Sequence, residues 1–530
     1  MSQRIAVDIA VIGASLGGTL AAWTACQRGH RVYLCNAFEW LGGQMTAQGV
    51  PPDEHHRIEH GGASASYLAF REAVREHYRS QPDFVDHSVL TEGCNPGDGW
   101  VSRLCFEPAW AAQWFETQLA PYLQSGHLTL HRRTEIVSAS RQGRSITSVT
   151  VEDAIGERFE IDAPYYLDAT DTGELIRAAG LPYRLGKESR AEWDEPLAPP
   201  LADPLDQQPV TWVLAVRRMA RPQPVSPTPP RYAFWKSYVL PHYGYRQFSD
   251  AIPGQGVAAL HLPFFAPSSD PQDKALDLWR YRRVIASHMS QTPRDEVSLI
   301  NWAQNDYGLH PLLDGPLLSS SDVELAAREL SLCWLHWLQT EAPRNDGMDG
   351  TVGYPELQPA TDILGTADGL AQQVYVRESR RIVGLDTLTQ GMVAATPGEP
   401  VQPLNLANAV GVAWYNMDIH PTCVSGHGLN AHVRPFTLPL GALVPRDCDN
   451  LIPACKNISV THLVNACTRV HPVEWLVGEV AALLASHCLQ HAASPSQVYA
   501  DPQATQSLQK LLSSRGIPIA WDAQVLATPT

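Results

Sequence analysis

Three absences narrow what this chain can do. Acidic residues outnumber basic ones by 55 to 39, and the formal net charge of −16 argues against a nucleic-acid partner, which needs clustered positive charge. No segment reaches the roughly 18 uninterrupted apolar residues that a membrane-spanning helix needs. The ten cysteines include no Cys-x-x-Cys pair, which disfavours a zinc site or a dithiol redox centre. We therefore expect no nucleic-acid partner, no membrane span and no bound metal.

What is present is the composition of an ordered globular protein. Hydrophobic residues make up 44% of the chain and charged residues 18%, far from the balance of disordered chains. The 530 residues exceed the size at which one hydrophobic core usually stops growing, which favours two domains. The first strand-like run begins at about Ile5 and leaves no room for a signal peptide, so we expect a cytoplasmic protein. The oligomeric state stays open.

The chain opens with a strand, a glycine-rich turn, a helix and a second strand. Residues 5–13 form an apolar run rich in Ile and Val, which is typical of a parallel strand covered on both faces. An Ala-rich helix follows and ends at Gly29, and residues 31–35 form the next strand. This βαβ beginning predicts an α/β fold in which a Rossmann-like domain, a parallel sheet flanked by helices, binds a dinucleotide.

The turn after the first strand matches the pattern G-x-G-x-x-G except at its second glycine. Gly13 permits a tight turn, and Gly18 lets the helix and the strand approach closely. Ser15 replaces the second glycine, but it is small enough for backbone N–H groups to reach a pyrophosphate at the helix N-terminus. The residues of this turn assigned to the dinucleotide are Gly13, Ser15, Leu16 and Gly18.

The residue expected to bind the ribose departs from the usual pattern. An acidic side chain normally follows the second strand, but this chain has Asn36 there and Glu39 three residues later. An amide can hydrogen-bond a hydroxyl but offers no carboxylate, so we expect the contact to be weaker or shared with Glu39. By this reasoning Asn36→Asp should keep or strengthen dinucleotide binding.

Four longer blocks carry a family resemblance. They are residues 41–56, 167–175, 375–382 and 438–481, and they are spread over most of the chain. Together with the glycine turn, they resemble the bacterial FAD-dependent oxidoreductase family of the glutathione-reductase-like (two-dinucleotide-fold) flavoprotein superfamily. The resemblance implies an FAD-dependent oxidoreductase that acts on a small-molecule substrate.

The resemblance also implies which parts of these blocks meet FAD. The small residues within 167–175 pass the chain beside the pyrophosphate, where bulky side chains would block the approach. The helix that begins at about Val473 directs its positive N-terminal dipole at the flavin pyrimidine ring, which favours the anionic reduced flavin. The further residues assigned to FAD are Gly42, Gly43, Gln44, Ala169, Thr170, Glu474 and Trp475.

Three reaction classes stay open. A second strand–glycine–helix fingerprint for NAD(P)H is missing, because Gly254-Gln255-Gly256 follows no apolar strand and is typical of a loop. This favours a dehydrogenase or oxidase that removes hydride from a C–H bond bearing oxygen or nitrogen and passes electrons to dioxygen or another acceptor. The alternatives are a flavin monooxygenase that uses NAD(P)H and dioxygen, and a non-redox flavoprotein such as an isomerase or cyclase.

Histidines and arginines near the end of the chain are candidates for catalysis. A histidine near neutral pKa can take a substrate proton as hydride leaves, and an arginine can clamp a carboxylate bidentately. The resemblance places the segment before the last long helix beside the flavin. We therefore expect His462 or His471 to act as base and Arg469 or Arg377 to hold an anionic part of the substrate, with His420 as a further base candidate. The competing interpretation is structural ion pairing.

Hydrophobic periodicity predicts the remaining elements. Helices are expected over residues 66–78, 107–123, 275–289 and 321–341, and several strands between about 128 and 170. A proline-heavy stretch from about 190 to 230 marks a domain transition. The predicted division is an FAD-binding domain in three parts (1–60, 105–190 and 431–495), a helical excursion (61–104), a mixed α+β substrate domain (191–430) and a C-terminal helical tail (496–530).

The glycine turn leads to a direct prediction. Purified protein should be yellow with FAD, whereas Gly13→Val and Gly18→Val should give colourless or misfolded protein, because a side chain at either position obstructs the turn or the close helix approach. The flavin absorbance per protein measures the outcome. Full flavin occupancy in both variants would show that the cofactor binds elsewhere.

Overall fold

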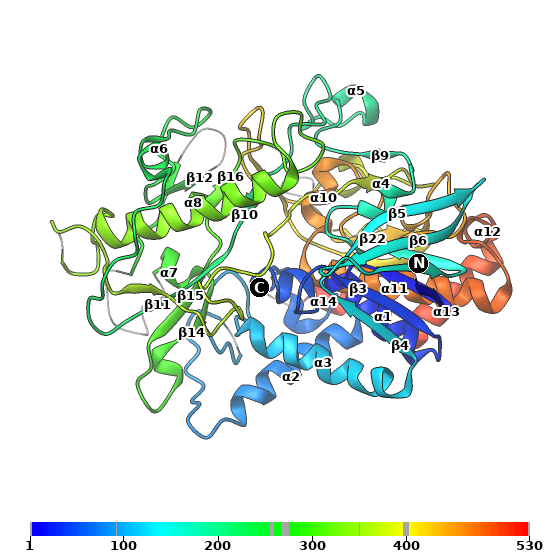
Figure 1. Ribbon diagram of the computed structural model, residues 1–530, viewed down its shortest axis with the longest axis horizontal. Helices are drawn as coiled ribbons and strands as arrows, with labels where there is room; N and C mark the ends of the chain where they lie inside the picture. The colour runs from blue at the N-terminus through cyan, green and yellow to red at the C-terminus, as the bar shows by residue number, and fades with distance from the viewer. Residues whose placement is uncertain are drawn as a thin grey trace.

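The computed structural model describes residues 3–91, 93–254, 259–266, 275–348, 350–395 and 402–527. Figure 1 shows the N-terminal segments (blue and cyan) beside the C-terminal segments (orange and red) on the right, and the middle of the chain around α8 on the left. The two ends of the sequence therefore build one half of the molecule together. The loop predicted around Gly254 continues into Gln255 and Gly256, which lie outside the described residues.

A five-stranded parallel sheet forms the centre of that half. Its strand order is β23-β8-β2-β3-β4, and all neighbouring strands are parallel. Strands β2 and β3 are buried throughout, as expected for strands covered on both faces. This sheet agrees with the predicted Rossmann-like α/β fold. Its strands are β2 Ile9–Ile12, β3 Val32–Asn36, β4 Leu128–Arg132, β8 Tyr165–Asp168 and β23 Leu451–Pro453.

The single strand predicted over residues 5–13 is wrong, because the chain forms two strands there. Strand β1 (Gln3–Ala6) joins a second sheet of order β1-β7-β6-β5, while β2 enters the parallel sheet. The break falls at Asp8, whose carboxylate accepts a hydrogen bond from the Arg31 N–H at 2.7 Å. The strands predicted between 128 and 170 are present, and those of the second sheet are β5 Thr134–Gln142, β6 Ser145–Asp153 and β7 Arg158–Asp162.

Helices α1 (Leu16–Gln27) and α11 (His471–His491) cross at a direct backbone contact. A Cβ atom on Gly478 would lie 2.0 Å from the carbonyl oxygen of Gly17, so this crossing leaves no room for a side chain. Helix α11 is long and apolar enough to cross a membrane, but 94% of its most apolar window is buried inside the protein, as in a core helix. The crossing holds the C-terminal part of the chain against the N-terminal turn.

The middle of the chain builds an antiparallel sheet of order β14-β15-β11-β17. Helix α8 (Ser320–Thr340) lies where a helix was predicted, and its Trp334 and Trp337 stack with ring centroids 5.0 Å apart in a separate hydrophobic core. The strands of this sheet are β11 Leu214–Arg218, β14 Arg283–Ile285, β15 Glu296–Ile300 and β17 Leu357–Pro359.

The helix predicted over 275–289 is wrong. The structure has only the single turn α7 (Leu278–Tyr281) there, followed by β14, because this segment pairs with β15. Arg280 and Arg283 are buried in ion pairs, with Asp277 and Glu296 respectively. In the sequence, these two arginines are spaced like the polar face of an amphipathic helix, which explains the wrong prediction.

The other predicted helices are present within two residues of their expected ends. They are α2 Ala65–Arg79 and α3 Pro108–Ser125, and the C-terminal tail forms α12 Pro495–Ala500, α13 Pro502–Ser514 and α14 Ala523–Ala527. Shorter helices are α4 Glu174–Ala178, α5 Arg190–Trp193, α6 Tyr232–Ser237, α9 Gln390–Val393 and α10 His462–Thr468. Five two-stranded sheets complete the described part: β9 Tyr183–Arg184 with β18 Arg381–Ile382, β10 Val210–Thr211 with β16 Asp306–Tyr307, β12 Ala251–Pro253 with β13 Ala259–His261, β19 Ala409–Ala413 with β22 Phe436–Pro439, and β20 Met417–Ile419 with β21 Leu429–Ala431.

Candidate active site

The glycine turn between β2 and α1 has the close packing that its sequence requires. Gly13 has a φ of +97°, and a Cβ there would lie 2.6 Å from the carbonyl oxygen of Ala169 and from the N atom of Thr170. A Cβ on Gly18 would lie 2.1 Å from the carbonyl oxygen of Gly13. Ser15 caps α1, because its hydroxyl accepts a hydrogen bond from the Gly18 N–H at 3.2 Å. The turn therefore packs segment 169–170 against Gly13 and the first turn of α1.

The Gly-Gly-Gln segment packs directly on this turn. Gly42 and Gly43 have φ values of +100° and +49°, and a Cβ on Gly43 would lie 2.7 Å from the backbone N of Leu16. The Gln44 side chain is fully buried, and its oxygen has no hydrogen-bond partner within the described residues. The same holds for both polar atoms of the Gln48 side chain. Such orphaned groups are rare in native proteins, and a bound polar ligand would satisfy them.

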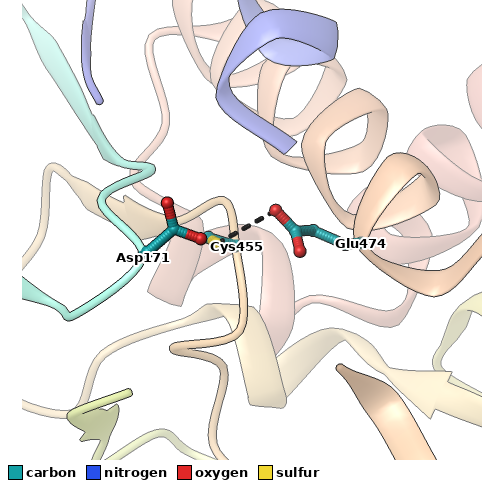
Figure 2. A group of neighbouring side chains, drawn as sticks. All are labelled: Asp171, Cys455 and Glu474. Atoms are coloured by element: carbon teal, nitrogen blue, oxygen red, sulfur yellow. Dashed lines mark hydrogen bonds between the residues drawn. The ribbon is translucent and has the colours of Figure 1, made fainter. Parts of the chain in front are cut away.

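A buried charge cluster lies at the start of α1. Figure 2 shows Asp171, Cys455 and Glu474 converging from three segments. The Cys455 thiol donates to Glu474 Oε1 at 3.2 Å, and the Gly17 N–H donates to the same oxygen at 3.2 Å. Asp171, Cys455 and Glu474 are near enough to share a metal ion, but the Lys456 ammonium pairs with both carboxylates. The cluster is therefore an ion-pair network with its own cation.

Three buried arginines gather around Tyr375. Arg469 donates to the Tyr375 hydroxyl at 2.7 Å, and the guanidinium carbon of Arg377 lies 4.9 Å from the centre of the Tyr375 ring. Arg282 interacts electrostatically with the same tyrosine and pairs with Asp53 at 3.2 Å. Within the described residues, the Nε–H of each of these arginines has no acceptor. A buried donor of this kind is costly unless an acceptor reaches it.

His420 lies between two carboxylates beside this arginine cluster. Its Nδ1 is 2.5 Å from an Asp306 oxygen and its Nε2 is 3.6 Å from an Asp418 oxygen. Burial and Arg377 lower the pKa of His420, but the two carboxylates outweigh them and raise it above its ordinary value of 6.5. Asp306 also pairs with Arg377, and Asp418 with Arg469. His420 is thus joined to the arginine cluster on both sides.

Both ring nitrogens of His471 are bonded to backbone. Its Nδ1 accepts from the Asp53 N–H at 3.0 Å, so its Nε2 carries the proton and donates to the Val50 carbonyl at 3.1 Å. Burial lowers the pKa of His471 to about 4, which keeps the ring neutral. With both nitrogens engaged, His471 fixes the segment 50–53 to the start of α11 and has no lone pair free for a substrate proton.

His462, the other expected base, belongs to a different network. Its backbone N–H and its Nδ1 both meet the same Glu188 oxygen at 2.8 Å. Glu188 also pairs with Arg381 at 2.8 Å. These two hydrogen bonds hold His462 against Glu188, and its expected role as base stays a prediction.

A family model for FAD-dependent oxidoreductases matches residues 8–512 of the chain. The chain belongs to the FAD-dependent oxidoreductase family. It is therefore an enzyme whose cofactor is FAD, and the predicted cofactor and enzyme class are confirmed. No curated protein matches the chain.

Similar solved structures are distant from this oxidoreductase. A geranylgeranyl bacteriochlorophyll reductase-like protein from Thermoplasma acidophilum is 10% identical, with 97% of this chain and 85% of that chain covered and a TM-score of 0.33. A myxobacterial chondrochloren halogenase is 16% identical (41% and 45% covered, TM-score 0.26), and a flavoprotein/dehydrogenase from Cytophaga hutchinsonii is 18% identical (41% and 48% covered, TM-score 0.24). The chain spans less than half the length of the halogenase and of the dehydrogenase. Sequence identities and TM-scores this low assign neither a substrate nor a reaction to this chain.

The residues around the glycine turn have the chemical groups that FAD binding requires. The turn at Gly13 and Gly18 leaves room only for backbone, and the N-terminus of α1 offers N–H groups that suit a pyrophosphate. The buried amides of Gln44 and Gln48 supply further polar atoms without protein partners in the described chain. These segments, together with Thr170, are the ones that would hold FAD.

Two assigned residues have other partners than the sequence suggested. The Asn36 side-chain NH₂ donates to the carbonyls of Phe38 and Trp40 at 2.8 and 2.9 Å, so it shapes the loop after β3. A carboxylate cannot make these donations, so Asn36→Asp should disturb this loop, while its effect on FAD binding stays a prediction. Glu39 is half exposed and pairs with Arg133.

Trp475 lies in the aromatic core beside α2. Its indole N–H donates to the Ser66 hydroxyl at 2.7 Å, and its ring packs edge-on against Tyr67 and near Phe70. The Trp475 side chain therefore anchors the start of α11 in the aromatic core.

Sequence reasoning missed several residues at this site. Tyr375 and Lys456 lie within recognised blocks, but neither was singled out. Asp306, Asp418 and Arg282 lie outside the blocks, and their sequence signal is a charged residue beside apolar strand residues. That signal is also typical of surface strands, so only the fold brings these groups together.

The Asn36 contacts lead to a second prediction. Asn36→Asp should lower the free energy of unfolding by about 1–3 kcal/mol, because two partly buried carbonyls lose their donor and face a carboxylate. Denaturant unfolding of the holoprotein measures this. The control is Asn430→Asp on exposed β21, where the side-chain oxygen only accepts from Asn416. Equal stability of the two variants would contradict the proposed role of Asn36.

Proposed function

We propose that the protein is an FAD-dependent dehydrogenase or oxidase that removes hydride from a C–H bond bearing oxygen or nitrogen in a small anionic molecule. The substrate binds at the arginine cluster around Tyr375, on the side of the molecule that adjoins the glycine turn. The proposal includes a place in the glutathione-reductase-like superfamily, which the unit β2, glycine turn, α1 and β3 supports.

The main support for this proposal is that the arginine cluster has buried N–H donors without acceptors in the described residues. Arg282, Arg377 and Arg469 are each at most 7% exposed, and the Nε–H of each lacks an acceptor in the described part of the chain. The Nδ2 group of Asn301, which accepts from Arg377 through its oxygen, is also unmatched. Buried donors without acceptors destabilise a protein, and a carboxylate is the acceptor that guanidinium groups match best.

The position of Arg469 connects this cluster to the cofactor segments. Its backbone carbonyl accepts from the Gln44 side chain at 3.2 Å, and its guanidinium reaches Tyr375 and the Asp418 carbonyl. An anion bound at Arg469 therefore lies next to the segment that would hold FAD. Bound FAD supplies the hydride acceptor, while the protein supplies position and charge.

His420 is the histidine best placed to take the substrate proton. His471 has both ring nitrogens on backbone groups. His462 and His420 both meet carboxylates, but the His462 side chain is only 6% exposed, whereas that of His420 is 24% exposed beside the arginine cluster. A base must be neutral to accept a proton, and the raised pKa of His420 means that it becomes neutral only above its ordinary value of 6.5.

The substrate assignment predicts the outcome of anaerobic mixing. Small 2-hydroxy or 2-amino carboxylates should bleach the flavin without NAD(P)H. Arg469→Met, which removes the donors but keeps most of the side-chain volume, should raise the half-saturating substrate concentration about 10- to 100-fold. Stopped-flow absorbance measures both quantities.

The control for Arg469→Met is Arg217→Ala on β11, whose side chain pairs with Asp362 near the surface. Equal half-saturating concentrations in both variants would show that Arg469 does not hold the substrate. Bleaching that requires NAD(P)H would support the monooxygenase alternative, and no change with either reagent would support the non-redox one.

The assignment of the base predicts a pH profile. Flavin reduction should accelerate as the pH rises through the raised pKa of His420 and then level off, because only neutral imidazole accepts the proton. His420→Gln should abolish this rise and slow reduction by about 10²- to 10⁴-fold. His462→Gln should keep the rise. If the pH dependence of flavin reduction were lost in His462→Gln but kept in His420→Gln, the base would be His462.

A further inference from the structure

A carboxylate lies on the N-terminus of α1. The Gly17 N–H donates to Glu474 Oε1 at 3.2 Å, and the Glu474 side chain is fully buried. In dinucleotide folds the N–H groups of this turn bind the pyrophosphate, which the positive end of the helix dipole also attracts. The same N–H group is therefore suited to two anions, the carboxylate of Glu474 and the pyrophosphate of FAD.

The charges around Glu474 do not leave room for both anions. Its second oxygen accepts from Gln44 at 2.7 Å and lies 3.4 Å from the Lys456 ammonium, which also pairs with Asp171. One buried cation thus faces two carboxylates before any cofactor charge is counted. A dianionic pyrophosphate would add further negative charge in a low-dielectric place, and protonation of a carboxyl is the usual relief.

We propose that FAD binding is coupled to protonation of Glu474. The pyrophosphate and the ionised carboxylate compete for the N-terminus of α1, and Glu474 takes one proton from solvent as the cofactor binds. The only bond formed on the protein is the O–H bond of the neutral carboxyl. The Lys456 ammonium then pairs with both the pyrophosphate and Asp171.

Glu474 is the carboxylate in this cluster that accepts from the α1 N-terminus. Asp171 is the closer partner of Lys456 and accepts from Gln373 at 3.1 Å, and its described contacts include none of the α1 N–H groups. The Cys455 thiol is already neutral, because burial raises its pKa well above the ordinary value. The other titratable groups around the turn and the first turns of α11 are Asp53, Asp168, His471 and Glu479.

Two of these neighbours provide controls, because they also titrate near neutral pH. Burial raises the pKa of Asp168 to about 6 and that of Glu479 to about 7. Asp168 accepts from Thr170 and Ile176, and Glu479 accepts from Ser66, so neither carboxyl touches the α1 N–H groups in the described contacts. Their protonation should be independent of the cofactor.

The test titrates the full-length chain, freed of flavin, with FAD in calorimetry. Runs in two buffers of different ionisation enthalpy give the number of protons taken up, which should approach about one per FAD at pH values where Glu474 is ionised in the flavin-free protein. The dissociation constant should rise up to about tenfold per pH unit in that range. ADP, which carries the pyrophosphate without the flavin, should show the same coupling, whereas riboflavin should show none.

Variants distinguish proton-coupled FAD binding from a simple role of Glu474 as a contact to FAD. Glu474→Gln should bind FAD without proton uptake and more tightly than wild type at high pH, while Glu479→Gln and Asp168→Asn should keep the wild-type coupling. Weaker FAD binding by Glu474→Gln with unchanged proton uptake would overturn the proposal, as would equal proton uptake with riboflavin. The ADP and riboflavin comparison on wild-type protein decides the matter even if Glu474→Gln fails to fold.

Discussion

The backbone contact between α1 and α11 is the constraint on which the rest of the structure depends. Gly17 and Gly478 let helices from opposite ends of the chain approach until a methyl group no longer fits. This approach brings the first turn of α11, with His471 and Glu474, against the glycine turn that follows β2. The five-stranded sheet makes the same connection, because β23 joins it beside β8. The segments proposed to hold FAD are therefore brought together by packing between distant parts of the sequence.

One side chain connects two regions of opposite charge. Gln44 donates to Glu474, in a cluster where carboxylates outnumber the cation, and to the carbonyl of Arg469, in a cluster rich in arginine. Its two hydrogen bonds join the first turn of α11 to the backbone of Arg469, whose guanidinium contacts Tyr375. Because the charged groups in both places are buried, their fields are weakly screened and act on any ligand that lies between them.

Local pattern predicted the elements whose residues pair or pack with near neighbours. The βαβ unit and the strands from 128 to 168 follow from alternation and from turn glycines, which short-range geometry decides. The errors arose where a distant partner decided the outcome: residues 3–6 leave the parallel sheet to pair with β7, and Arg283 enters a strand because Glu296 neutralises it. The donor role of Asn36 and the pairing of Lys456 with Asp171 depend on folded distances that no spacing in the sequence encodes.

The position of β23 and α11 late in the chain has a consequence for synthesis of the enzyme. The ribosome releases β2, β3, β4 and β8 long before residues 451–491, so the growing chain exposes one edge of β8 and the apolar face that α11 later covers. Until residues 451–453 have been synthesised, this edge of β8 is open to pairing with other chains. Late closure of the sheet therefore leaves the growing chain with an unprotected strand edge for most of its synthesis.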